Sequence, residues 1–133
     1  MRSSGGNPRV IVVSATVLSR PDDDDAPLRE ALTAAGADAE TRAWDDPTVD
    51  WAGAGVAVIR STWNYVAHHD AFLAWAERCA AVTSLWNPVN VVRWNSHKGY
   101  LLELAAAGLP VVPTRSPATT PIWQPWQPDG TRW

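Results

Sequence analysis

The 133-residue chain is 46% hydrophobic and 19% charged, has a formal net charge of −3, and contains 11 prolines, 9 tryptophans and one cysteine. This composition excludes a wholly disordered chain, and the length suits one domain that buries about two thirds of its extended surface on folding. The acidic balance disfavours a nucleic-acid partner, the lone Cys79 excludes an intrachain disulfide, and no apolar run reaches the ~20 residues that span a membrane.

The first part of the chain contains two strand patterns with a helix between them. Residues 1–8 have no apolar period and are expected to form a flexible leader. Residues 9–15 form a β-branched run, which is typical of a strand buried on both faces of a parallel sheet. No signal-peptide cleavage pattern follows this run, so a cytoplasmic location is expected. A helix is predicted from the acidic residues 22–25 to Gly36, and a short strand near a sheet edge over residues 38–43.

The remaining patterns continue this alternation. After a linker, residues 56–59 form a second buried-strand run, and a loop then leads to a helix that begins near Asp70. The later elements are a strand over residues 84–86, a brief helix with Asn87 as N-cap and Pro88 as first residue that runs through Trp94, a helix from Ser96 to Ala107, and an extended piece over residues 111–114.

These elements predict an α/β fold, with an open parallel sheet of four to five strands flanked by helices in the Rossmann-like manner. The predicted domain covers residues 9–114. Residues 115–133 contain four prolines and three tryptophans without a helical or strand period. Two interpretations of this segment stay open: a disordered proline-rich tail, or sequence read out of frame after a truncation, which the abrupt change in composition favours.

Polar residues follow the strand predicted at 56–59. Arg60, Ser61 and Thr62 come directly after it, and Asn64 lies two residues further on. In an open α/β sheet, ligands bind beyond the carboxyl ends of the strands, and an arginine there binds a carboxylate or phosphate through two N–H groups. We therefore predict that these four residues form a substrate-binding loop. The alternative is that Arg60 only pairs with one of the chain's many aspartates.

Lys98 is the only lysine among the 11 basic residues. It falls in the first turn of the helix predicted from Ser96, where free backbone N–H groups and the helix dipole attract phosphate. From the residues alone, a surface lysine behind an ordinary asparagine–serine cap is the simpler interpretation.

Three further features are assigned no binding role. His68, His69 and Asp70 resemble a metal site only in composition, since adjacent histidines point in different directions on a helix. The aspartates at 22–25 lack the ligand spacing of a calcium loop and are expected to form a solvated helix start. Cys79 falls on the apolar stripe of its helix and is expected to be a core thiol. No metal ligand and no catalytic residue is predicted.

An ordered set of motifs resembles the ATP-grasp superfamily of ligases. The set consists of Arg-Ser-Thr-Trp-Asn-Tyr at 60–65, Asn-Pro at 87–88, Val-Arg-Trp-Asn at 92–95 and Gly-Leu-Pro-Val-Val-Pro-Thr at 108–114. The last three are similar to the segment that leads from the pre-ATP-grasp domain into the ATP-binding domain. The first is similar to an actinobacterial subgroup that contains the D-cycloserine-forming ligase. The resemblance covers residues 9–114.

The resemblance implies roles for the residues that match its motifs. Lys98 matches a lysine that contacts the phosphates of ATP. Arg60, Ser61 and Thr62 match a loop near the acceptor substrate, and Asn64 stands where the subgroup often has aspartate.

The resemblance also implies what a complete enzyme uses. ATP-grasp ligases activate a carboxylate as an acyl phosphate, which an amine or similar nucleophile attacks, and acidic residues of the C-terminal domain hold Mg²⁺ with ATP. After Thr114 the only acidic residue is Asp129, and lysine, glutamate and asparagine are absent. We therefore expect the catalytic ATP-grasp domain to be missing, and the chain alone to bind neither ATP nor Mg²⁺ tightly.

The leading hypothesis is a substrate-side N-terminal domain of an ATP-grasp ligase that joins a carboxylate to an amine or a thiol. This domain would be truncated or split from its catalytic half and inactive alone. Its expected partners are a small-molecule substrate and a separately encoded ATP-grasp domain, and an exposed crevice also favours a homo-oligomer. The alternatives are a standalone small-ligand binding or regulatory α/β module, and a truncated product without function.

Overall fold

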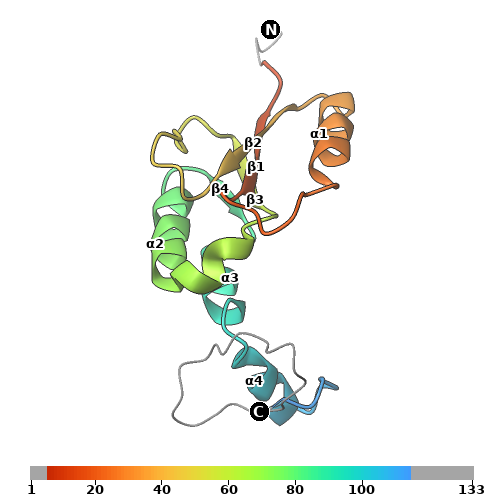
Figure 1. Cartoon of the computed structure of the whole chain (residues 1–133), viewed down its shortest axis with the longest axis vertical. Helices are drawn as coiled ribbons and strands as arrows, with labels where there is room; N and C mark the ends of the chain where they lie inside the picture. Colours follow the sequence, from red (N-terminus) through yellow and green to blue (C-terminus); the bar gives the residue numbers. More distant parts are fainter. Residues whose placement is uncertain (1–5, 115–133) are drawn as a thin grey trace, which may run out of the picture. The chain divides into compact units, whose positions relative to one another are not determined.

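The structure is a computed structural model that describes residues 6–114 (Figure 1). The predicted tail at 115–133 and most of the predicted leader lie outside the described residues. The chain divides into two compact units, the first ending at Ser96 and the second beginning at His97. In chain order the elements are β1 (Arg9–Ser14), α1 (Asp25–Ala34), β2 (Asp38–Ala43), β3 (Val56–Ile59), the 3₁₀ helix η1 (Trp63–His68), α2 (His69–Ala80), β4 (Ser84–Trp86), α3 (Val89–Asn95) and α4 (Tyr100–Ala106).

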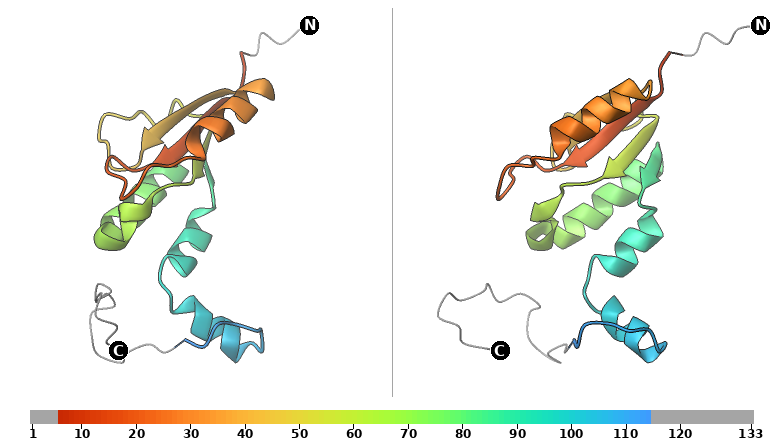
Figure 2. Two further views of the ribbon diagram at one scale, coloured as in Figure 1. Left: turned by 45° about the vertical axis from the view of Figure 1, so that its right-hand side comes forward. Right: turned by 90° about the vertical axis from the view of Figure 1, so that its right-hand side faces the viewer.

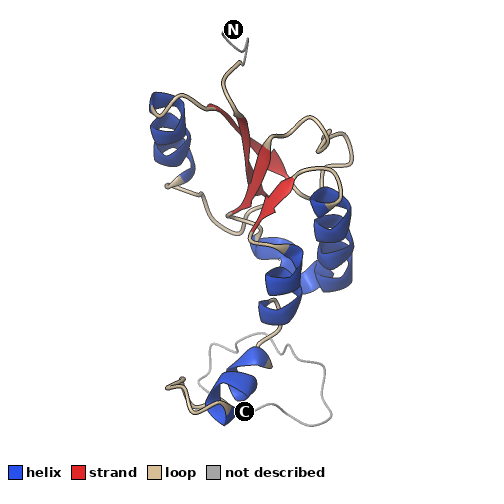
Figure 3. Cartoon of the chain, turned by 180° about the vertical axis from the view of Figure 1, so that it is seen from behind, coloured by secondary structure: helices blue, strands red, loops and turns tan. Residues whose placement is uncertain are grey.

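The strands form a four-stranded parallel sheet in the order β2-β1-β3-β4. Figure 3 draws the strands in red and the helices in blue. In the central strand β1, Val12 pairs with Thr41 of β2 on one side and with Val58 of β3 on the other. Leu85 of β4 pairs with Ala57 of β3. The predicted α/β fold with a parallel sheet flanked by helices is therefore confirmed, and β2 is an edge strand as expected.

Helices pack on both faces of the sheet (Figure 2). α1 packs over β2 on one face, while α2 packs on the opposite face with α3 against it. The β-branched run of β1 suits this arrangement, because Ile11 and Val13 face α2 and the alternating Val12 is buried on the other face. The buried core on the α2 side consists of Ile11, Val13, Ala15, Trp44, Ala54, Ala57, Phe72, Trp75, Ala76, Cys79, Leu85 and Val92.

The connection between β2 and β3, residues 44–55, runs along the α2 side of the sheet without forming a helix. Trp51 in this connection packs against the core, with its ring centroid 5.2 Å from that of Trp75. Gly55 lies so close to β1 that a Cβ atom there would be 2.9 Å from the carbonyl oxygen of Arg9. These contacts hold the connection against the core and against β1.

The starts of α1 and α2 agree with the prediction, and glycines follow two of the helices. Gly36 (φ +91°) follows α1 and Gly108 (φ +80°) follows α4, as expected for residues that adopt left-handed backbone at little cost. The predicted start of α3 was wrong, because Pro88 occupies the N-cap position and not the first helical position. The predicted loop after β3 contains η1, and residues 111–114 are described without strand structure.

The predicted start of the last helix at Ser96 was also wrong. Residues 96–99 form a bend and a turn, and α4 begins only at Tyr100. In this turn the backbone N–H of Gly99 donates a hydrogen bond to Nδ1 of His97 at 3.1 Å. Such a local bond between side chain and backbone competes with helical hydrogen bonding.

Among residues 6–114, no helix has the length and apolar character to cross a membrane.

Candidate functional site

The candidate site lies at the carboxyl ends of β1 and β3. The chain passes from β1 to β2 on one side and later enters β3 on the other, so strand order reverses between β1 and β3. Open α/β sheets bind their ligands at such a reversal. The backbone N–H groups of Arg60 and Ser61 donate to the carbonyl oxygen of Val13 at 3.1 and 3.0 Å, which fixes the loop after β3 at this position.

Arg60 is exposed at this edge of the sheet and forms an ion pair. Its Nη2 lies 2.8 Å from Oδ2 of Asp24, in the loop before α1, and the two side chains are 40% and 75% exposed. The pairing with an aspartate that was considered as the alternative therefore occurs. The contact joins one nitrogen to one oxygen, so it is not bidentate, and an exposed pair of this kind contributes about 0–1 kcal/mol.

Ser61 and Thr62 are buried, at 1% and 4% exposure, and hold the loop in place. The hydroxyl of Ser61 donates to Oδ2 of Asp22, and the carbonyl oxygen of Thr62 accepts from the backbone N–H of Tyr65 at 2.9 Å. A buried hydroxyl that has a carboxylate partner is satisfied within the protein. Of the predicted substrate-binding residues, Arg60 is the one that is exposed.

Asn64 connects three loops at the same edge of the sheet. Its Nδ2 donates to Oδ2 of Asp45 at 2.7 Å, and its Oδ1 accepts from Nε1 of Trp44 at 2.7 Å. Asp45 also accepts hydrogen bonds from the backbone N–H and the hydroxyl of Thr16, both at 2.8 Å. We call Thr16, Trp44, Asp45 and Asn64 the three-loop cluster, because they follow β1, β2 and β3 in turn.

The electrostatics of the three-loop cluster favour an ionised Asp45. Burial raises the pKa of its carboxyl group, but the hydrogen bonds from Thr16 and Asn64 outweigh burial and lower the pKa below its usual value. The carboxylate thus stabilises the loop arrangement while charged.

Sequence reasoning missed three aspartates that the structure places at this edge. Asp24 is the exposed N-cap residue of α1, as expected for a solvated helix start, but the contacts of Asp22 with Ser61 and of Asp24 with Arg60 were not expected. These contacts join residues 36 and 39 positions apart, and no local pattern signals them. Asp45 could have been found, because it lies two residues after the strand predicted at 38–43.

Lys98 lies in the second unit, in the turn between α3 and α4. Its Nζ is 5.9 Å from the ring centroid of Tyr100, and the residue is exposed. The expectation that Lys98 lies within the first turn of a helix was wrong, because α4 begins two residues later. The structure therefore brings Arg60, Ser61, Thr62 and Asn64 together on one loop and places Lys98 in the other unit.

Two residues that were assigned no binding role, His69 and Cys79, contact other parts of the protein. Nε2 of His69 lies 2.9 Å from the hydroxyl of Ser96, and Cys79 is 1% exposed in the core, as predicted. Burial raises the pKa of the Cys79 thiol to about 11. Within residues 6–114, no group of three or more histidine, cysteine, aspartate or glutamate side chains is arranged to hold a metal ion.

The parallel sheet with helices on both faces defines the class of the chain, which is that of the Rossmann-like α/β domains. The family model described as D-cycloserine synthetase DcsG, N-terminal domain, matches residues 10–87, more than half of the chain. The chain therefore belongs to the family of D-cycloserine synthetase N-terminal domains.

Two relatives support this membership. The cycloserine biosynthesis protein DcsG of Streptomyces lavendulae is 42% identical over 106 residues, which cover 79% of this chain and 36% of the relative. The crystal structure of D-cycloserine synthetase DcsG matches with a TM-score of 0.74 and 41% identity, over 79% of this chain and 35% of that one. The predicted resemblance to the group with the D-cycloserine-forming ligase is confirmed, and the chain spans about a third of the length of these relatives.

Proposed function

We propose that this chain is the substrate-side N-terminal domain of an ATP-dependent ligase of the ATP-grasp type, which joins a carboxylate to an amine or a thiol. The observation that carries the proposal is the exposed guanidinium of Arg60 at the strand reversal, in a chain whose relatives include D-cycloserine synthetase. A biosynthetic reaction that consumes ATP is expected to take place in the cytoplasm.

Arg60 is the residue that binds and orients the acceptor substrate. Its exposed N–H groups form a planar fork that suits a carboxylate, and the weak pair with Asp24 holds this fork at the edge of the sheet. Ser61 and Thr62 are buried and hold the start of the loop in place. Asn64 connects the loop to those after β1 and β2 through the three-loop cluster. The substrate is thus oriented before the chemical step, which lowers the entropic cost of that step.

Lys98 is the candidate phosphate contact in the complete enzyme. Its exposed ammonium group is a mobile point charge of the kind that binds phosphate oxygens. ATP supplies the energy that activates the substrate carboxylate. The described residues do not fit Mg²⁺, because none of their acidic groups is clustered as metal ligands. We therefore assign the binding of ATP and Mg²⁺ to an ATP-grasp domain, and expect neither to bind tightly to this chain alone.

The proposal includes partners. The residues of this chain match about a third of these relatives, and we expect turnover to require an ATP-grasp domain; a separately encoded one is the proposed protein partner. A small molecule with a carboxylate is its expected ligand. Self-association into a homo-oligomer is a second way to cover the exposed edge.

A graft tests the proposed function. Residues 10–114 replace the matching segment of the S. lavendulae relative, and substrate-dependent ADP release is measured. The graft is expected to be active, and Arg60→Ala within it to lose most of that activity. Arg93→Ala is the matched control, because Arg93 also pairs with an acid, Glu77, but lies outside the Arg60 loop. A folded graft without activity, or equal activity in the two variants, would contradict the proposal.

Calorimetry distinguishes the ligase-domain proposal from the alternative of a standalone binding module. The 133-residue chain is titrated with Mg-ATP, and weak or no binding is expected. Tight binding would favour a regulatory or binding module that works without a catalytic partner. If the chain neither binds a ligand nor supports activity in the graft, the truncated product without function becomes the better account.

A further inference from the structure

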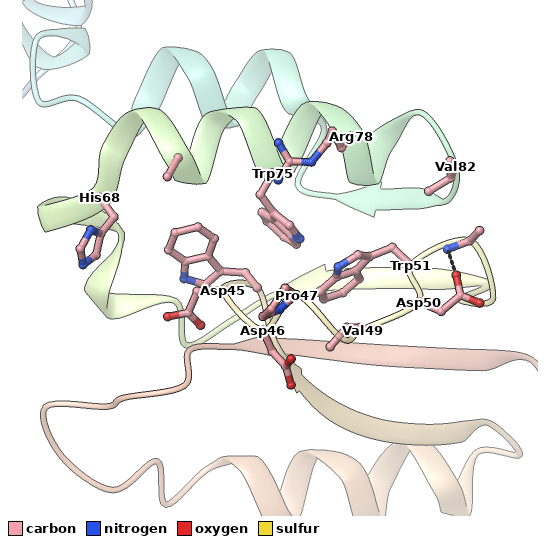
Figure 4. Close-up of a pocket in the computed structure, with 13 residues that line it drawn as sticks. Asp45, Asp46, Pro47, Val49, Asp50, Trp51, His68, Trp75, Arg78 and Val82 are labelled. Carbon is pink, nitrogen blue, oxygen red and sulfur yellow. Dashed lines mark hydrogen bonds between the residues drawn. The ribbon is translucent and has the colours of Figure 1, made fainter.

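A cavity lined by residues other than Arg60 lies between α2 and the β2–β3 connection (Figure 4). Its volume is about 780 Å³, within the range of about 300–1,000 Å³ that is common for small-molecule sites. We call it the tryptophan pocket. The lining residues that matter here are Trp44, Trp51, Trp75, Asp45, Asp46 and Asp50.

Three indole rings form the apolar wall of the tryptophan pocket. Trp75 projects from α2 toward the connection, and Trp51 meets it at a centroid distance of 5.2 Å and an interplanar angle of 71°. The Trp44 ring lies 6.1 Å from that of Trp75. Trp44 and Trp75 are buried and Trp51 is half-buried, so the core holds the wall in place. Indole faces carry a negative potential that attracts cations.

Carboxylates dominate the polar side of the pocket. Hydrogen bonds from the hydroxyl and backbone N–H of Thr48 lower the pKa of Asp46, and Asp50 accepts a hydrogen bond from the backbone N–H of Ala52 at 3.0 Å. With Asp45, the lining holds three carboxylates and one guanidinium, that of Arg78, while Arg9 and Arg42 outside the lining also act electrostatically on Asp50 and Asp46, respectively. Outside the lining, Arg9 and Arg42 both pair with Glu40.

One buried donor of the wall has no acceptor. Nε1 of Trp75 is inaccessible to solvent and has no hydrogen-bond partner within the described part of the chain, residues 6–114. Buried N–H groups are nearly always paired, so an orphan beside a cavity points to an acceptor that arrives with a ligand.

We propose that the tryptophan pocket binds a small organic cation that also carries an oxygen acceptor, of the amino-alcohol type. The positively charged nitrogen lies against the ring of Trp51, in the negative field of the pocket's carboxylates, and the oxygen accepts from Nε1 of Trp75. This site is independent of the Arg60 loop and of the ligase proposal, since none of the residues that would contact the cation belongs to that loop.

Choline and its neutral isostere 3,3-dimethylbutan-1-ol provide a direct test with the full chain. The two molecules share shape and hydroxyl group and differ in charge. Each is titrated while the indole N–H signals of the nine tryptophans are followed by NMR, after assignment by Trp→Phe substitution. Choline is expected to shift the Trp51 and Trp75 signals saturably and to bind about tenfold more tightly than the alcohol. Sodium chloride at equal ionic strength is the blank.

Charge variants complete the test. Asp46→Asn with Asp50→Asn keeps the acceptor oxygens that serve Thr48 and Ala52, and is expected to weaken choline binding about fivefold or more. The matched control, Asp23→Asn with Asp70→Asn, removes two exposed carboxylates outside the pocket and is expected to leave binding unchanged. Equal affinity for choline and the alcohol, equal loss in both double variants, or no saturable shift with choline would overturn the proposal.

Discussion

Arg60 and Asp24 are joined by a contact of 2.8 Å that ties the carboxyl end of β3 to the loop before α1. Both side chains are exposed, so the pair contributes little to the stability of the fold. The contact nevertheless positions the guanidinium beside the loop before α1. Under the proposed function, Arg60 exchanges this weak partner for the carboxylate of the substrate.

Arg60→Ala is therefore expected to affect activity far more than stability. The free energy of unfolding should fall by less than about 1 kcal/mol, because the lost pair is exposed. In the graft, kcat/KM should fall by about tenfold or more, since the substrate carboxylate loses its fork of donors. Arg60→Lys should recover only part of the activity, because an ammonium group is not bidentate. Urea unfolding and steady-state kinetics check both parts, and unchanged kcat/KM in Arg60→Ala would remove Arg60 from the site.

Lys98→Ala tests the proposed phosphate contact. Lys98 is exposed in a turn, so the free energy of unfolding should change by no more than about 0.5 kcal/mol. In the graft, the KM for ATP should rise and kcat/KM should fall by about tenfold, while Lys98→Arg keeps the charge and most of the activity. Equal kinetics in Lys98→Ala and the unsubstituted graft would show that Lys98 is an ordinary surface lysine.

The sheet and the Arg60 loop could be predicted because their signals are local. The β-branched run of β1 and the short apolar run of β3 fit strands buried in a parallel sheet, and Arg60 follows β3 directly. Gly36 and Gly108 end their helices through backbone geometry that other residues adopt at a cost. Each of these features depends on residues close together in the chain.

The features that escaped prediction depend on contacts or on competing local bonds. The partners of Arg60 and Ser61 lie in a loop that a single sequence cannot place beside them. At Ser96 the residue types favour a helix start, but the hydrogen bond from Gly99 to His97 supports a turn. The short 3₁₀ helix η1 carries no hydrophobic period that would reveal it.

Cys79 is expected to be unreactive in the folded chain. Its side chain is 1% exposed, and burial raises its pKa to about 11, so the thiolate is scarce at neutral pH. A thiol reagent such as Ellman's reagent should leave the native chain unmodified and label it stoichiometrically in denaturant. Because the chain has one cysteine, the signal has one source. Rapid labelling under native conditions would show that α2 opens readily.

Asp45→Asn is expected to destabilise the fold through the three-loop cluster. An asparagine there would turn an NH₂ group toward Thr16 or toward the Nδ2 donor of Asn64 and lose one of the accepted hydrogen bonds. The expected loss at pH 7 is about 1 kcal/mol, since the group is only half-buried and solvent screens its charge.

The pH dependence of this loss gives a second check. Because the pKa of Asp45 is lowered on folding, its charged form stabilises the native state above the unfolded pKa of about 3.9. That contribution is lost as the pH falls through the lower pKa of the folded state. The difference in unfolding free energy between the native sequence and Asp45→Asn should therefore shrink between pH 6 and pH 3, as measured by urea unfolding across about this range. The exposed Asp23→Asn variant is the control, and a difference that stays constant down to the acid limit would show that the Asp45 charge does not hold the three loops together.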